Sequence, residues 1–126
     1  MTEFLDRDDI LTAGAVAVGH ALEIRDFGLL DAAAARPQTT VYGVDAYPDL
    51  YSKAAALLQL LARNHAVTDS NKRTAWAAAW TFLHINGVEL AAGFDVDAAE
   101  TFMNDLAQRG ELTIDEIAGT MASFAA

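Results

Sequence analysis

The chain has 126 residues, of which 53% are hydrophobic, and this length and apolar content predict a single folded domain over residues 1–126 with one core. Its formal net charge of −10 argues against nucleic acid as a partner, because binding to phosphates needs a basic face. It has no cysteine, no apolar run of the ~18 residues that a membrane span needs and no signal-peptide pattern at its start, so we expect a cytoplasmic protein without a membrane partner.

The first third of the chain predicts two helices. Asp6 is placed to cap a helix whose apolar positions keep helical spacing over residues 10–21. On this pattern we expect His20 at a partly buried edge of the helix. Asp26 is placed to cap a shorter helix that stops before Pro37, since a proline disfavours helix at the residue before it.

Residues 38–48 are the one stretch with strand and turn character. β-branched and aromatic residues are followed by Gly43 and Pro48, which punctuate turns. The extended piece is expected over Thr39, Thr40, Val41 and Tyr42.

Pro48 and Asp49 are expected to start a third helix, which runs from about Leu50 to Arg63. It is apolar nearly all round, which is typical of a buried central helix. Asn64 is expected to end it in a left-handed conformation. The next helix should run over residues 71–86, with Asp69 or Ser70 as its cap and Gly87 after its end. Its apolar residues at helical spacing are expected in the core: Trp76, Trp80 and Leu83.

The last part of the chain predicts two more helices. Asp95 is placed to cap the fifth, which Gly110 ends, and Thr113 with Glu116 forms a capping box for the sixth, up to about Phe124. The pattern as a whole predicts an all-α fold, a compact bundle of about six helices with one short extended segment.

The segment from His65 to Thr74 carries the clearest chemical signal. A helix start offers free backbone N–H groups and the positive end of the helix dipole, which suit phosphate. Lys72 and Arg73 add positive charge there, Asp69 is suited to Mg²⁺, and His65 is suited to proton transfer near neutral pH. Chemistry alone therefore indicates a phosphate site beside a base, while an ordinary polar turn between two helices remains the alternative.

This segment resembles the signature of the Fic/Doc family. The wider family reads His-Pro-Phe-x-Asp/Glu-Gly-Asn-Gly-Arg-x-x-Arg, and its Doc branch reads His-x-Phe-x-Asp-x-Asn-Lys-Arg-Thr. The positions that agree with the Doc form are His65, Asp69, Asn71, Lys72, Arg73 and Thr74. Flanking residues are similar too, so that the resemblance covers most of residues 25–90. It implies a Fic/Doc-type helical bundle in which residues 39–42 form a flap that positions the target polypeptide by backbone pairing.

The resemblance also implies roles for the site residues. His65 would be the general base that takes a proton from a target hydroxyl, and Asp69 would orient Mg²⁺ or the nucleophile. Phosphates of ATP would be held at the helix start by Ser70, Asn71, Lys72 and Arg73. Arg63, one turn before the loop, is a further candidate for phosphate binding, although an exposed helix-end cation is an equal alternative.

Two positions distinguish the reaction types of the family. In Fic proteins, which transfer AMP from ATP, a glycine follows the motif asparagine and a second arginine comes three residues after the first. Here Lys72 and Trp76 stand at those positions, which favours the Doc branch. Doc-type proteins transfer the γ-phosphate of ATP to a threonine of elongation factor Tu, halt translation, and pair with an antitoxin of the Phd type. The resemblance therefore implies an ATP-dependent Ser/Thr phosphotransferase toxin.

One departure keeps a third interpretation open. The motif phenylalanine, which is expected to anchor the loop in the core, is Val67 here, and Ala66 precedes it. Loss of this burial predicts a looser loop. The alternatives are thus a Fic-type AMP transferase, disfavoured by Lys72 and Trp76, and a catalytically weak family member that acts by binding a protein.

Overall fold

Helices form most of this protein. The computed structural model describes residues 1–126, with the exception of the Arg109 side chain. Within that described part there are six α-helices, one 3₁₀ helix and one two-stranded hairpin, which confirms the all-α prediction. In chain order the elements are α1 (Arg7–Val18), α2 (Phe27–Ala35), η1 (Arg36–Gln38), β1 (Thr40–Val41), β2 (Val44–Asp45), α3 (Leu50–Arg63), α4 (Asn71–Ile85), α5 (Val96–Arg109) and α6 (Ile114–Ser123).

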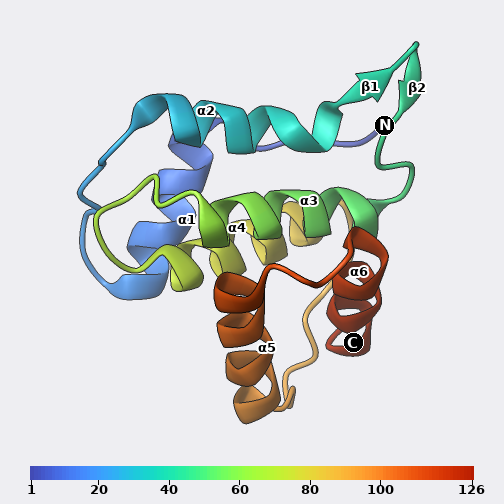
Figure 1. Cartoon of the computed structure of the whole chain (residues 1–126). Helices are drawn as coiled ribbons and strands as arrows, with labels where there is room; N and C mark the ends of the chain where they lie inside the picture. The colour runs from blue at the N-terminus through green and yellow to red at the C-terminus, as the bar shows by residue number, and fades with distance from the viewer.

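The core is organised around α3 and α4, which pack against each other at the centre (Figure 1). α1 covers α4, while α6 and α5 pack against α3 from another side. α3 is buried through Leu57, Leu58 and Leu61, as its near-continuous apolar pattern predicts. α4 buries Phe82 and Leu83 on the face that packs on the core. No helix in the described part is long and apolar enough to span a membrane.

Helix starts follow the capping pattern of the sequence. An Asp or Thr side chain accepts a hydrogen bond from a first-turn amide at the start of five helices, and this satisfies one of the donors that a helix start leaves free. The capping residues are Asp6, Asp26, Asp49, Asp95 and Thr113. These caps confirm the predicted helix starts to within a residue.

Two helix ends differ from expectation. α1 stops at Val18 because Gly19 adopts a left-handed conformation (φ 85°), so His20 lies outside the helix and is exposed rather than partly buried. The prediction for Asn64 is also wrong, since its φ is −83° and the left-handed residue is its neighbour His65 (φ 52°). In both cases the spacing of apolar residues could not show which residue would adopt the left-handed turn conformation.

α1 lies unusually close to the start of α4 at Gly14. A Cβ atom there would sit 2.6 Å from Leu22 Cδ1 and 2.8 Å from Thr74 Oγ1, distances that only a glycine tolerates. α1 is also joined to α2, because Arg7 Nε donates to Asp31 Oδ1 at 2.9 Å. That hydrogen bond holds the pKa of the exposed Asp31 carboxyl below its ordinary value.

The extended segment is a β-hairpin that projects from the bundle (Figure 1). Thr40 pairs with Asp45 and Val41 with Val44. Tyr42 and Gly43 both have positive φ, 52° and 79°, which is the two-residue turn that suits the twist of a hairpin. The apolar side chains of this hairpin face solvent: Val41, Tyr42 and Val44 are 55%, 101% and 69% exposed.

Candidate active site

Residues 64–70 form the loop that joins α3 to α4 at one end of the central pair (Figure 1). Within this motif loop, His65 and Asp69 are exposed, whereas Ala66 and Val67 are each only 1% exposed. The ring of His65 makes no hydrogen bond to any residue that the structure describes. The loop therefore anchors itself by its middle and presents its chemically active side chains to solvent.

Backbone hydrogen bonds tie the motif loop to the chain just before α2. The carbonyl of Ala66 accepts from the amides of Arg25 and Asp26 at 2.9 and 3.0 Å, and the Thr68 amide donates to the Glu23 carbonyl at 2.9 Å. Val67 forms an antiparallel bridge with Ile24. These bonds use main-chain atoms and therefore do not involve the side chain at residue 67 directly.

The amide of Asn71 closes the motif loop from the other side. Its Oδ1 accepts from the Val67 N–H at 3.3 Å and its Nδ2 donates to the Val67 carbonyl at 3.0 Å. Asn64 makes a similar brace, accepting from the Ala66 amide and donating to the Leu29 carbonyl. The sequence predicted Asn71 as a phosphate ligand; in the structure its side chain is engaged in shaping the loop.

The start of α4 keeps its first-turn amides available. Ser70 occupies the cap position with φ 65°, and its side chain makes no capping hydrogen bond. The Ser70 amide itself donates to Asp69 Oδ1 at 2.7 Å, so this amide, expected at a phosphate, is already occupied. The N–H groups of residues 71–73 have no intrahelical acceptor and face the positive end of the dipole, an arrangement suited to an anion.

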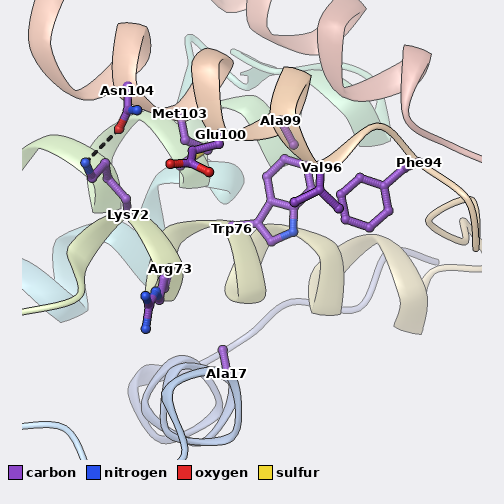
Figure 2. Close-up of a pocket in the computed structure, with 10 residues that line it drawn as sticks. All are labelled: Ala17, Lys72, Arg73, Trp76, Phe94, Val96, Ala99, Glu100, Met103 and Asn104. Atoms are coloured by element: carbon purple, nitrogen blue, oxygen red, sulfur yellow. Dashed lines mark hydrogen bonds between the residues drawn. The ribbon is translucent and has the colours of Figure 1, made fainter.

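Three cations were expected near this helix start, and they point in different directions. Lys72 Nζ donates to Asn104 Oδ1 on α5 at 2.7 Å, while Arg73 is exposed and points to the α1 side (Figure 2). Arg63 lies against α5 instead of the motif loop, with its Nε donating to the Leu106 carbonyl at 2.9 Å. The structure thus brings Lys72 and Arg73 to the helix start and directs Arg63 away.

A pocket of about 500 Å³ opens beside Lys72 and Arg73, between α4 and α5 (Figure 2). Trp76, which the sequence predicted in the core, is instead half-buried and forms the floor of this pocket. Its ring centroid lies 5.8 Å from that of Trp80, 5.7 Å from that of Phe94 and 5.6 Å from that of Phe124. A second hollow of about 720 Å³ runs on between α1 and α4 and shares Ala17 and Trp76 with the first. Together they form one groove, the α1–α4–α5 groove, which has an apolar floor and ends at the two cations. Its lining also includes the acidic residues Asp9, Glu89 and Glu100.

Sequence reasoning missed the α5 side of this groove. Glu100 and Asn104 are four residues apart and so share one helix face. The four-residue spacing is visible in the sequence, but nothing in the sequence indicated that this face of α5 would contact Lys72.

Comparison with known proteins agrees with the motif. The model of the Fic/DOC family matches residues 4–83. The chain belongs to the Fic/Doc family. Over 126 residues it is 70% identical to Toxin Doc of Mycolicibacterium smegmatis, covering all of this chain and 96% of that protein. It is also 34% identical to the Protein kinase doc of Escherichia phage P1 over 99 residues, which are 76% of this chain and 72% of that protein.

The resemblance to the family implies Mg²⁺, and the residues of the motif loop offer one way of holding this ion. Among the described residues there is no group of three or more His, Cys, Asp or Glu that could enclose a metal. Mg²⁺, however, is commonly held by one carboxylate together with substrate phosphates. Asp69, exposed beside the start of α4, is the carboxylate suited to that arrangement.

The hairpin, which the resemblance predicted to be a target-positioning flap, lies away from the motif loop. Its base contacts the first half of α3, where Arg36 Nη1 donates to the Ala56 carbonyl at 2.9 Å. The motif loop begins at the opposite end of α3, and Figure 1 shows the two at opposite ends of that helix. Ala56 and Asn64 are separated by about 12 Å along the helix axis, so Thr39–Tyr42 are not in contact with His65.

Proposed function

We propose that this protein is the toxin of a toxin–antitoxin pair and transfers the γ-phosphate of ATP to a Ser/Thr hydroxyl of a translation factor, elongation factor Tu. The observation that carries the proposal is the juxtaposition of an exposed histidine with an uncapped helix start bearing two cations, His65 and Lys72-Arg73. The names of the two relatives, Toxin Doc and Protein kinase doc, support the same activity.

In this mechanism His65 is the general base. A ring nitrogen of His65 takes the proton of the target hydroxyl, and the hydroxyl oxygen forms a bond to the γ-phosphorus. The bond from the γ-phosphorus to the bridging oxygen breaks, and ADP leaves with that electron pair. Phosphoryl transfer depends mainly on positioning and on offsetting charge, which suits a loop held rigidly on both sides with its histidine in solvent.

The start of α4 supplies the positive charge. The amides of residues 71–73 and the side chains of Lys72 and Arg73 bind phosphate oxygens, for which Lys72 exchanges its hydrogen bond with Asn104. Asp69 would hold Mg²⁺, which would supply positive charge at the phosphates when bound. Arg63 has no part in this scheme, because its guanidinium lies against α5.

The AMP transferase alternative is disfavoured by the environment of Trp76. Where the wider family places its second arginine, this chain has an indole within an aromatic cluster, which offers apolar surface in place of a phosphate clamp. A catalytically weak, purely binding protein is disfavoured because the motif loop is fixed by main-chain bonds and by the Asn71 amide despite the smaller Val67.

Labelled ATP distinguishes these functions. Purified protein, Mg²⁺ and elongation factor Tu are incubated with ATP labelled at either the γ- or the α-phosphate. We expect label on elongation factor Tu from γ-labelled ATP alone. Transfer of the α-label would establish an AMP transferase, and no transfer from either by the folded protein would favour the binding role.

We further propose that the α1–α4–α5 groove receives the antitoxin. An elongated apolar floor that ends at Lys72 and Arg73 fits an amphipathic helix carrying acidic side chains at one end. Such a helix would cover both phosphate-binding cations, which gives a direct way to neutralise the toxin.

Filling this groove tests the antitoxin proposal. Ala17 is exposed and lines both parts of the groove. Ala17→Trp should weaken binding of a Phd-type antitoxin at least about tenfold, measured by calorimetry, while phosphotransfer persists. Ala32→Trp, on the exposed face of α2, is the matched control and should bind antitoxin like the unmodified protein. Equal affinity of the two variants would place the antitoxin elsewhere.

A further inference from the structure

A buried lysine joins the hairpin to the central helix. Lys53 is the fourth residue of α3, and its side chain is only 7% exposed. Its ammonium donates to the backbone carbonyl of Tyr47 and to Asp45 Oδ2, the latter at 3.3 Å. A buried charge is costly unless it is paired and hydrogen-bonded. Both partners of the Lys53 ammonium lie at the base of the hairpin: Asp45 ends strand β2, and Tyr47 follows it by two residues.

The other arm of the hairpin is fixed by a second contact. Arg36, just before the hairpin, donates through Nε to the Tyr47 hydroxyl at 3.1 Å and through Nη1 to the Ala56 carbonyl of α3 at 2.9 Å. Its guanidinium also lies 5.6 Å from the centre of the Tyr47 ring. The base of the hairpin is therefore clamped to α3 on both sides, although its outer part is solvent-exposed.

The motif loop is fixed to the opposite end of the same helix. Lys53 and Arg63 are ten residues apart, which corresponds to about 15 Å along a straight helix. The central helix thus acts as a rigid spacer between the hairpin and the catalytic histidine. A target that contacts both must present its hydroxyl at a matching distance from the segment that meets the hairpin.

We propose that Lys53 is a positioning residue for the protein target: its buried ammonium holds the hairpin on α3 and so sets the separation between the reacting loop and the hairpin, whose exposed Val41, Tyr42 and Val44 side chains form an apolar surface for the target. This inference rests on the proposed function for its consequence in catalysis. The clamp itself is a property of the free protein. The target that fits this arrangement is a folded protein surface, since a short peptide around the hydroxyl would leave the hairpin unoccupied.

The clamp can be tested without any activity. The chain has no cysteine, so a spin-label pair at Val44→Cys on the hairpin and Ala122→Cys on α6 reports their separation alone. We expect Lys53→Met to broaden the distance distribution. The matched control is Arg7→Met, which breaks the Arg7–Asp31 pair away from the hairpin and should leave the distribution unchanged. A distribution equally narrow in Lys53→Met would overturn the proposal.

The consequence is tested by steady-state kinetics on unlabelled protein. Lys53→Met should raise KM for elongation factor Tu about tenfold, the equivalent of one good contact, with KM for ATP unchanged. Asp45→Asn keeps Lys53 and weakens only its ion pair with residue 45. This variant should also raise KM for elongation factor Tu, but by less than Lys53→Met does. A change in thermal stability with both KM values unaltered would reduce Lys53 to a structural role. Absence of transfer by the unmodified protein would refute the proposed function and leave the spin-label result to decide the clamp.

Discussion

Replacing His65 by alanine is expected to lower phosphotransfer by about 10²–10⁴-fold, the range for loss of a general base. The ring of His65 is exposed and makes no hydrogen bond to a described residue, so the folded protein should lose nothing else. The melting temperature of His65→Ala should therefore equal that of the unmodified protein. The rate is measured with γ-labelled ATP and elongation factor Tu at saturating concentrations of both.

The other two histidines provide matched controls for this variant. His20 and His84 are also exposed, and His84 lies at the end of α4 with its Nδ1 2.6 Å from Glu89 Oε1. Alanine at either position should leave the rate within a factor of about two, as for surface substitutions away from a site. A His65→Ala variant as active as these controls would remove His65 from the mechanism.

Replacing Asn71 by alanine is expected to destabilise the protein by about 2–4 kcal/mol, because two buried main-chain groups of Val67 would lose their partner. The same change should abolish most activity, since the motif loop would no longer hold its shape. Chemical denaturation of the protein without nucleotide measures the stability. A residue that served only as a phosphate ligand would leave the stability of the free protein unchanged.

Two further variants separate these roles of Asn71. Asn71→Asp keeps an oxygen that accepts from the Val67 amide but cannot donate to the Val67 carbonyl, so an intermediate loss of stability is expected. Asn104→Ala removes a single hydrogen bond to the exposed Lys72 and should change stability by less than about 0.5 kcal/mol. Asn71→Ala as stable as Asn104→Ala would contradict the bracing role.

Much of the fold was readable from the chain because capping and burial are local signals. An acidic or hydroxyl side chain before an apolar run marked five helix starts, and the leucine-rich pattern of residues 50–63 marked the central helix. What failed was the end of α1 and the left-handed position after α3. Those depend on which of two adjacent residues takes one turn conformation, and helical spacing carries no information on that choice.

The sequence predicted which residues lie at the candidate site but not where all of their side chains point. The motif identified His65, Asp69, Lys72 and Arg73, which do share one loop and helix start. It did not indicate that Arg63 would turn to the Leu106 carbonyl. Side-chain direction depends on the neighbouring helix, and the placement of α5 is set by long-range packing that no local pattern encodes.

The backbone conformation at the end of the motif loop decides which residue types suit its last position. Ser70 adopts φ 65°, a conformation that glycine reaches without the steric penalty of a β-carbon. The wider family signature has glycine at this position. Because the Ser70 side chain gives α4 no capping hydrogen bond in return, glycine at residue 70 would keep this backbone conformation at a lower steric cost.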